Sequence, residues 1–473
     1  MGINKVQYGN TTLIDLTNDT VTPSVLMEGY TAHDRSGAVI TGTATGGGTG
    51  AISVVDTTDT HGGTIRTITA VDISDTTAVA SDVAQGKYFY TADGTKTAGT
   101  STGGGGDTNP TALKKQINFI DYDGTIRYSY TSSEWASVTA LPSNPSHSGL
   151  VSQGWNWTKA QIDAQLTAIP NGDVWVGQMY ITESGDTEID VAFFDSARLS
   201  PIMTICVNGT VEVDWGDNTT ADTVTGTSLT TRLAVPHTYA SAGSYMIKIH
   251  VVSGEFTFYG STVYTLLRKN TTTNENKGYA YTIKAVRIGN GANIGTYAFY
   301  YCSSLASVTI PSTTTNIGTG AFQYCYSLAS LTIPNGVIDI NGSVFMYCNT
   351  LAKVAISGAV TTIAGSVFSS CYSLASLTIP NGVTSIGNGM ISSTCLLASL
   401  IIPSTVTSIG SSAFSSCYGM AEYHFKSTTP PTLGTNAFNY IVSDCKIYVP
   451  STSLEAYQTA ENWSTYASYM VGE

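Results

Sequence analysis

The chain has 473 residues, a formal net charge of −13, and only 11% charged residues. Binding to nucleic acid or to an anionic membrane needs clustered Lys and Arg, and no basic run occurs, so the composition argues against both partners. The length allows three or four domains, and the many Thr, Val, Ile and Tyr residues with 47 glycines predict a mainly β, multidomain protein.

The N-terminal hundred residues contain two short β modules, which we place at 1–50 and 51–107. Each has an Asp/Gly turn before a closing Gly-Thr, as in VLMEGYTAHDRSGAVITGT and VAQGKYFYTADGTKTAGT. Asp93-Gly94 predicts a hairpin, and the alternation of Thr and Val from Ile52 to Ile73 predicts one or two strands. The glycines at 103–106 predict a flexible linker.

These modules, and especially residues Leu13 to Thr43, resemble the short N-terminal modules of tail and fibre proteins from bacteriophages of Gram-positive gut bacteria. The resemblance implies a virion location in the tail, with attachment to other phage tail or baseplate proteins through the N-terminus. Neither module is large enough for an independent core. We therefore expect oligomerisation or docking to order them, and we predict a homo-oligomer, with a trimer as the expected state.

No segment of the sequence has the pattern of a membrane or secretion signal. The opening MGINKVQYGNTTLIDL has no apolar core of signal-peptide length, and no uninterrupted apolar span of about 18 residues follows. We expect synthesis in a host cytoplasm, retention there until assembly, and no membrane insertion.

Residues 108–172 predict a small α+β module. QINFIDYDGTIRYSY has two alternating runs around Asp123-Gly124, which indicates a hairpin, and Thr158 precedes an amphipathic helix. The segment resembles a module of the same phage fibre proteins, located between the attachment end and the tip. Trp155 and Trp157 have two interpretations, stacking on a sugar or closing a small core, and the core is favoured.

Residues 173–285 predict a further β domain. GTVEVDWGDNTT, followed by VPHTYASAGSYMIKIHV, resembles the PKD domain, and this implies an immunoglobulin-like sandwich that acts as a spacer. Glu212, Asp214 and Asp217 form an acidic group that would suit calcium or acid/base chemistry. We favour a structural role, because Asp side chains in such a turn cap backbone N–H groups and no calcium-loop pattern is present.

A 23-residue repeat organises residues 286–426. Each unit reads I-G-x-x-A-F-x-x-C-x-x-L-A-S-L-T-I-P, and a constant period of this length predicts stacked coils that share one core. The predicted core positions recur as three columns: Leu305, Leu328, Leu351, Leu374 and Leu397; Phe299, Phe322, Phe345, Phe368 and Phe414; and Cys302, Cys325, Cys348, Cys371 and Cys417.

The units resemble the BspA-type leucine-rich repeat, as in IGTGAFQYCYSLASLTIP (Ile317 to Pro334). The resemblance implies a leucine-rich-repeat solenoid, and proteins with this repeat are mostly surface and adhesion proteins. Residues 427–473 do not continue the repeat pattern. Leu454, Tyr457 and Trp463 predict a short helical C-terminal cap over the last coil. Similar tails close other BspA-type arrays.

The cysteines favour a ladder of buried thiols. Residues in one register point the same way from neighbouring coils, which is the wrong geometry for a disulfide. Zinc would need ligand pairs at short spacing such as C-x-x-C, and none is present.

The sequence predicts no enzyme and no cofactor. Asp339 and Glu422 are the only acidic residues between Ile294 and Lys426, and they lie more than three coils apart, beyond the spacing that glycoside hydrolysis requires. The six histidines are scattered, and none follows a nucleophile motif. The glycine-rich segments lack the Lys of a phosphate loop.

Two surfaces of the predicted solenoid are candidates for binding. The outward strand positions give a hydroxyl-rich face with little charge: Ser307, Thr309, Ser330, Thr332, Lys353, Ser376, Thr378, Ser399 and His424. The candidate receptor-binding residues are the tyrosines that recur near the cysteine column: Tyr301, Tyr324, Tyr326, Tyr347, Tyr372 and Tyr418. A tyrosine offers a flat apolar ring and a polar hydroxyl, which suit a carbohydrate or a protein. The alternative is that these rings fill coil corners.

These observations predict a phage tail-fibre or tail-tip protein that binds a host surface glycan or protein through its C-terminal solenoid. One alternative is a bacterial cell-surface adhesin with the same repeats. Another is a structural baseplate or head-appendage protein whose solenoid contacts other virion proteins.

Overall fold

The structure is a computed structural model of the chain. It describes eight strands within residues 4–98, and residues 117–473 except for 171, 262–264, 270–278 and 395. The chain divides into two compact units, Met1–Pro110 and Thr111–Glu473.

The first unit contains short antiparallel strands. Four of them form a sheet in the order β2-β1-β3-β4: β1 (Asn4–Tyr8), β2 (Thr11–Leu16), β3 (Thr31–His33) and β4 (Val39–Thr41). Two pairs follow: β5 (Val54–Thr58) with β6 (Thr64–Ile68), and β7 (Tyr88–Tyr90) with β8 (Lys96–Ala98). The pairs confirm the strands predicted between Ile52 and Ile73 and on both sides of Asp93-Gly94. Asp93-Gly94 itself and the glycines at 103–106 lie outside the described residues.

The second unit begins with a small module of one sheet and two helices, which we call the docking module (residues 117–182). Its elements are β9 (Ile117–Ile120), β10 (Ile126–Tyr130), α1 (Ser132–Trp135), β11 (Leu150–Trp155), α2 (Lys159–Ala168) and β12 (Val174–Thr182), and the sheet order is β10-β9-β12-β11. Gly124 has φ +82°, as the predicted hairpin requires. Thr158 forms a capping box with Gln161 at the start of α2. Trp155 and Trp157 are buried, so the core interpretation is confirmed.

Residues 187–309 form a single eight-stranded sheet in the order β15-β14-β16-β13-β18-β20, with β17 beside β14 and β19 beside β16. The strands are β13 (Thr187–Phe193), β14 (Ile202–Asp214), β15 (Asp222–Pro236), β16 (Gly243–Phe258), β17 (Leu267–Arg268), β18 (Ile283–Arg287), β19 (Ala292–Ile294) and β20 (Ser307–Thr309), and η3 (Ser196–Arg198) is a short 3-10 turn. The predicted PKD-like sandwich is not confirmed. The sheet continues into the solenoid because β18 pairs in parallel with β20.

The acidic turn of this sheet has the structural role that the sequence favours. Asp214 accepts a hydrogen bond of 2.9 Å from the backbone N–H of Gly216, and Asp217 accepts one of 3.2 Å from that of Thr219. Both carboxylates therefore cap the turn, as Asp residues in turns commonly do.

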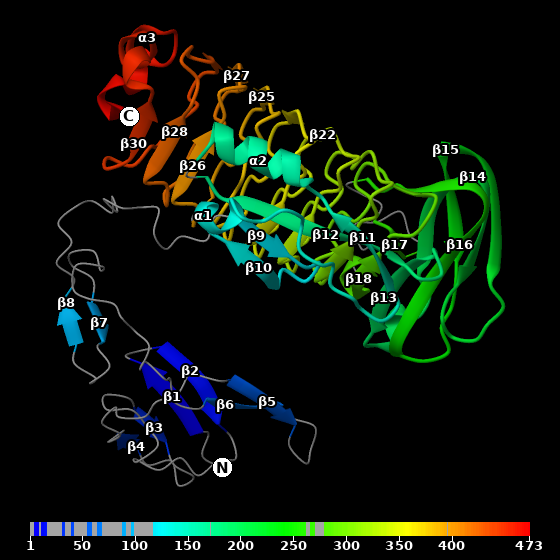
Figure 1. Cartoon of the computed structure of the whole chain (residues 1–473). Coiled ribbons are helices and arrows are strands. Elements are labelled where there is room, and N and C mark those ends of the chain that lie inside the picture. The colour runs from blue at the N-terminus through cyan, green and yellow to red at the C-terminus, as the bar shows by residue number, and fades with distance from the viewer. Residues whose placement is uncertain are drawn as a thin grey trace. The chain divides into compact units, whose positions relative to one another are not determined.

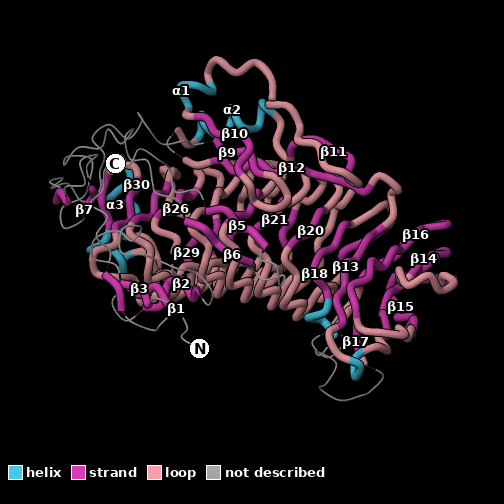
Figure 2. The backbone as a smooth tube through the Cα atoms, turned by 90° about the horizontal axis from the view of Figure 1, so that it is seen from below, coloured by secondary structure: helices cyan, strands magenta, loops and turns pink. Residues whose placement is uncertain are grey.

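The solenoid coils stack through two rows of short parallel strands, which Figure 2 shows as a series of similar turns. One row contains β21 (Ser330–Thr332), β23 (Lys353–Ala355), β26 (Ser399–Ile402), β28 (Glu422–Phe425) and β30 (Lys446–Val449). The other contains β22 (Asp339–Ile340), β24 (Thr362–Ile363), β25 (Ser385–Ile386), β27 (Ser408–Ile409) and β29 (Thr432–Leu433). Partners in neighbouring coils are 23 residues apart, as in the pair Ile363 and Ile386.

The solenoid extends beyond Lys426, into the range that the sequence assigns to the C-terminal cap. Ser408 pairs with Thr432, and Tyr423 pairs with Ile447. Each pair is 24 residues apart, so one extra residue shifts this coil out of the 23-residue frame. The cap follows, with η5 (Ser451–Ser453), α3 (Leu454–Thr459), η6 (Ser464–Tyr469) and β31 (Met470–Gly472). In Figure 1, α3 lies at one end of the coils and the sheet of β14–β16 at the other.

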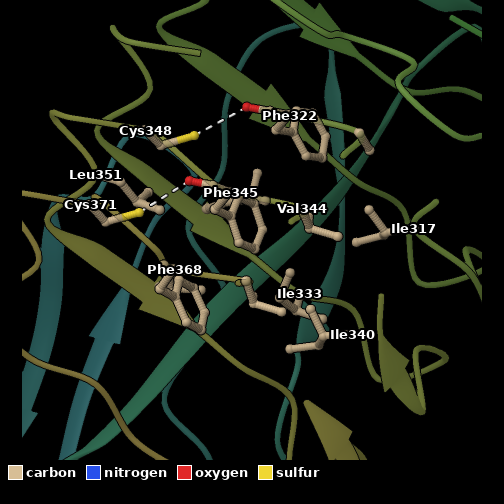
Figure 3. Packing of buried hydrophobic residues seen from close by; sticks show 14 of the residues in the cluster. Ile317, Phe322, Ile333, Ile340, Val344, Phe345, Cys348, Leu351, Phe368 and Cys371 are labelled. Carbon is tan, nitrogen blue, oxygen red and sulfur yellow. Dashed lines mark hydrogen bonds between the residues drawn. The ribbon is translucent and has the colours of Figure 1, made fainter. Parts of the chain in front are cut away.

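The interior of the coils contains the three predicted columns, and all fifteen side chains are at most 4% exposed. Neighbouring phenylalanines stack, with ring centroids 5.9 Å apart for Phe322 and Phe345. The thiol of Cys348 donates to the carbonyl oxygen of Phe322 at 3.1 Å, and the thiol of Cys371 donates to that of Phe345 at 3.1 Å (Figure 3). The seven cysteines of the described residues are free thiols. The thiols of Cys325, Cys348, Cys371 and Cys417 therefore each tie one coil to the coil before it.

Candidate binding surface on the solenoid

The hydroxyl-rich strand face is not an open surface over most of its length, which corrects the first candidate surface. Thr309, Ser330, Thr332 and Thr378 are buried, with 4–7% exposure. The docking module covers them, and its β12 lies against β20, β21 and β23. In both Figure 1 and Figure 2 the sheet of this module and α2 lie along the coils.

Side chains of the docking module hydrogen-bond directly to this face. Asn156, which is fully buried, donates from Nδ2 to the carbonyl oxygens of Ile333 at 2.8 Å and Ala355 at 2.9 Å. The indole N–H of Trp175 donates to the hydroxyl of Ser376 at 2.7 Å. The outward hydroxyls thus serve contact within the chain, and Ser399 near the C-terminal end is the one exposed residue of this face.

The tyrosines at the other candidate surface occupy a special backbone position. Tyr301, Tyr324 and Tyr347 have φ of 62°, 64° and 63°, in the left-handed region. The same position of the next three coils is filled by serines, Ser370, Ser393 and Ser416, with φ of 60°, 64° and 59°, and that of the following coil by Tyr440, with φ of 59°. A non-glycine residue here is strained, and a large aromatic residue gains nothing from the turn itself. The tyrosine coils and the serine coils therefore differ at this position in the side chain and its contacts, not in the backbone.

Four of the six predicted tyrosines form one cluster. Tyr324 and Tyr347 stack with centroids 4.7 Å apart and an interplanar angle of 5°. Tyr301 and Tyr326 contact Tyr324 at centroid distances of 5.6 Å and 6.0 Å. All four are partly exposed, so the cluster is a surface feature with its own packing. Both interpretations of these tyrosines, coil-corner packing and contact with a ligand, remain compatible with this geometry.

The other two tyrosines are separate from the cluster and more open. Tyr372 is 42% exposed and Tyr418 is 59% exposed. They occupy one position two coils apart, which is roughly 10 Å along the solenoid. Two further exposed apolar side chains of the coils were not predicted, Leu396 at 58% and Tyr440 at 66% exposure. We call the six predicted tyrosines together with these two residues the tyrosine edge.

The tyrosine edge is uncharged. A tyrosine hydroxyl is protonated at neutral pH and keeps a donor and an acceptor, and burial raises the pKa of Tyr324 and of Tyr326 further above the ordinary value. Between Ile294 and Phe425 the only residues with a formal charge are Asp339, Lys353 and Glu422. Binding at this edge would therefore depend on ring contacts and hydroxyl hydrogen bonds.

One group of titratable residues was missed by the sequence reasoning. His424 lies between Glu422, 3.2 Å from Nε2, and Glu473, 2.9 Å from Nδ1. Glu473 lies beyond Lys426 and outside the repeat, so no repeat position connects it with His424. Lys426 also pairs with Glu473. In the part of the chain that the structure describes, no group of three or more His, Cys, Asp or Glu residues is arranged to hold a metal ion.

The stack of parallel strands and the column of leucines define a leucine-rich-repeat solenoid. More particularly, residues 292–421 and 392–460 match the family model of the BspA type leucine rich repeat region, in six copies. The second range extends into the coil that has the 24-residue step. The repeats of this chain are therefore of the BspA type.

Several solved leucine-rich-repeat structures resemble part of the chain. One is a leucine rich repeat protein of T. pallidum, with 23% identity over 32% of this chain and 75% of that chain, at a TM-score of 0.26. Another is a leucine rich cell surface protein of Faecalibacterium prausnitzii A2-165, with 21% identity over 42% and 72% of the chains, at 0.24. A third, from Bacteroides ovatus ATCC 8483, has 20% identity over 39% and 58%, at 0.23. TM-scores this low do not define a shared overall structure.

No curated protein matched the chain in the corresponding comparison. Among the described residues, no helix is both long enough and apolar enough to cross a bilayer.

Proposed function

We propose that this chain is a non-catalytic contact protein that binds a bacterial surface receptor, a glycan or a protein, through the tyrosine edge of its solenoid. The observation that carries the proposal is the placement of Tyr301, Tyr324 and Tyr347 in left-handed turns where the next three coils have serine. A strained position that keeps a large side chain points to a role for that side chain.

The chemistry of the edge supports the same proposal. Aromatic rings with a polar hydroxyl are enriched at recognition surfaces because they combine contact area with hydrogen bonding. Tyr418 and Tyr440 are 59% and 66% exposed, and exposed apolar side chains gathered on one surface are a mark of a contact site. A rigid stack of coils holds these rings in fixed positions, which lowers the entropy that binding must overcome.

Two settings suit a protein of this kind. In the first it is a bacterial cell-surface adhesin, supported by the BspA-type repeats and by what the resemblance to that family implies. In the second it is a virion tail fibre, supported by the resemblance of residues Leu13 to Thr43 and of the docking module to phage fibre modules. In this second setting the chain is a homotrimer attached to tail or baseplate proteins through its N-terminus. Genomic neighbours, phage structural genes or surface-protein genes, distinguish the two settings.

Binding of the full chain to bacterial cells tests the proposal. Fluorescently labelled protein is added to a panel of Gram-positive and Gram-negative strains, and bound fluorescence is measured. The double variant Tyr324→Ser with Tyr347→Ser keeps the residue type that later coils use, and we expect it to lower binding roughly tenfold, as loss of central aromatic contacts does. Periodate treatment of the cells abolishes binding to a glycan, whereas protease treatment abolishes binding to a protein.

The matched control is the double variant Ser370→Ala with Ser416→Ala, which alters the same position of other coils without removing a ring. We expect it to bind as the unmodified chain does. Equal binding by the tyrosine variant, or no binding to any strain by the unmodified chain, would contradict the proposal.

A further inference from the structure

A cleft of about 440 Å³ lies where the docking module meets the eight-stranded sheet, and the proposed function does not use it. One wall comes from the module, with Tyr122, His147 and Leu150. The other wall comes from strands of the sheet: Glu188 of β13, Met246 and Lys248 of β16, Val286 and Arg287 of β18, and Ser307 of β20. Ligand sites of this size form preferentially at such junctions between parts of a chain.

The polar groups of the sheet wall are held in place before any ligand arrives. Arg287 donates from Nε to Glu188 at 2.8 Å, and its two terminal nitrogens donate to the two carboxylate oxygens of Asp190 at 3.0 Å and 2.8 Å. The Glu188 side chain is 15% exposed and the Arg287 side chain is 21% exposed. A bidentate pair of this kind fixes both side chains, so the remaining hydrogen-bonding positions are preorganised.

Lys248 and Glu188 leave room for a ligand group. Their charged atoms are 3.6 Å apart, which is longer than a hydrogen bond between nitrogen and oxygen. The ammonium therefore keeps donors to offer, and the Glu188 oxygen facing it keeps a lone pair. One hydroxyl group of a ligand satisfies both, because it accepts from the lysine and donates to the carboxylate.

The module wall adds an aromatic and apolar surface. The rings of Tyr122 and His147 lie at a centroid distance of 5.1 Å and an angle of 80°, and Nε2 of His147 is fixed by the buried carboxylate of Asp121 at 2.8 Å. Leu150 and the partly exposed Met246 extend this surface across the cleft. The cleft thus combines ring and aliphatic contacts with donors and acceptors at fixed positions.

From this arrangement we infer that the cleft binds a small neutral polyhydroxylated ligand, a monosaccharide or a disaccharide unit. An anion is disfavoured because the negative charges of Glu188 and Asp190 balance the positive charges of Lys248 and Arg287. A purely apolar ligand is disfavoured because it leaves the groups of Lys248 and Glu188 desolvated without partners. A sugar presents a C–H face to aromatic and aliphatic side chains, and its hydroxyls both donate and accept.

Saturation-transfer-difference NMR on the full chain tests the inference. The probes are free glucose, galactose, mannose, rhamnose and N-acetylglucosamine, each measured separately, with inorganic phosphate in a parallel titration. We expect saturation transfer to at least one sugar. Leu150→Trp fills the cleft and abolishes the transfer, whereas Val151→Trp, on the opposite face of β11 where Val151 is 48% exposed, leaves it unchanged.

A second variant keeps the test valid if the tryptophan disturbs folding. Lys248→Met removes the ammonium and retains the length of the side chain, and we expect it to weaken sugar affinity roughly tenfold, the loss of one charge-assisted hydrogen bond. Lys446→Met, at an exposed position of β30, is its control and leaves affinity unchanged. Transfer to none of the sugars, transfer that survives in both cleft variants, or binding of phosphate instead of a sugar overturns the inference. The tyrosine-edge variants do not alter the transfer, so the outcome is independent of the proposed function.

Discussion

The indole nitrogen of Trp157 donates a hydrogen bond of 2.7 Å to the carbonyl oxygen of Ile356, 199 residues further along the chain. Trp157 lies two residues before α2 of the docking module, and Ile356 directly follows strand β23 of the solenoid. Both residues are buried. The docking module and the coils are therefore one structural unit. The contribution of their contacts to the free energy of unfolding can be measured.

Asn156 offers the first measurement at this junction. Its Nδ2 bonds to two solenoid carbonyls, and its Oδ1 accepts from the backbone N–H of Gly177 at 2.7 Å. Asn156→Ala removes all three bonds and leaves buried backbone groups without a partner. We expect the free energy of unfolding to fall by roughly 3 kcal/mol, since each such group costs about 1–3 kcal/mol. Urea denaturation followed by circular dichroism measures the change.

Asn144→Ala is the matched control, because Asn144 is exposed on the same module. It should change the free energy of unfolding by less than about 0.5 kcal/mol. An Asn156→Ala variant as stable as this control would show that the module contributes little to the stability of the coils.

Gly177 supports a second prediction about the same junction. A Cβ atom at this position would lie 2.1 Å from Oγ1 of Thr332 and 2.7 Å from its Cβ. Gly177→Ala therefore forces β12 away from β21, and we expect a loss of roughly 1–3 kcal/mol, as for other overpacked sites. Removing the opposing side chain with Thr332→Gly should restore part of the loss in the double variant. A double-mutant cycle by urea denaturation measures this coupling, and purely additive effects would contradict the proposed contact.

The sequence predicts the interior of the coils well because the 23-residue period identifies which positions are buried. Leucine, phenylalanine and cysteine recur at fixed positions, and an apolar side chain that recurs in every coil has only the shared core to enter. The last coil is different. Its partner positions, such as Tyr423 and Ile447, are 24 residues apart, so this coil lies outside the constant 23-residue period.

The repeat pattern does not predict that the docking module covers the strand face. Serine and threonine at outward positions suit water and suit a docked protein surface equally, so Ser330 and Thr332 give no signal of the module that buries them. No periodicity connects residues 117–182 with the coils. The left-handed turns of the tyrosine edge are also not predictable from the sequence. A bulky residue such as tyrosine rarely adopts a positive φ, so its presence does not indicate such a turn.

The buried thiols predict a loss of stability at alkaline pH. Burial raises the pKa of Cys371 from its ordinary value of 9.0 to about 12, and burial raises the pKa of Cys325 and Cys348 as well. Between these two pH values the unfolded chain releases thiol protons that the folded chain keeps. The free energy of unfolding is therefore at its full value below about pH 9 and falls as the pH rises toward about 12.

Cys371→Thr isolates one of these groups, and Thr394 already occupies the same position of the next coil. In urea denaturation at a series of alkaline pH values, the variant should lose stability less steeply, by up to about 1.4 kcal/mol per pH unit. Identical pH dependence in the variant and the unmodified chain would mean that the thiol titrates alike in both states.

Glu473 predicts the opposite dependence at acid pH. Burial alone would raise the pKa of this carboxyl, but hydrogen bonds from His424 and Lys426 hold it below its ordinary value of 4.5. A carboxyl with a lowered pKa stabilises the folded chain above that value, and the stabilisation disappears as the pH falls through the folded-state pKa. Glu473→Gln should therefore lower the melting temperature by a few degrees at neutral pH, and the difference should shrink and vanish in acid.

Glu461→Gln, at an exposed position of the same cap, should show no such pH-dependent difference in differential scanning calorimetry. A Glu473→Gln difference that persists unchanged at low pH would mean that the carboxylate charge does not hold β28 against the C-terminal strand.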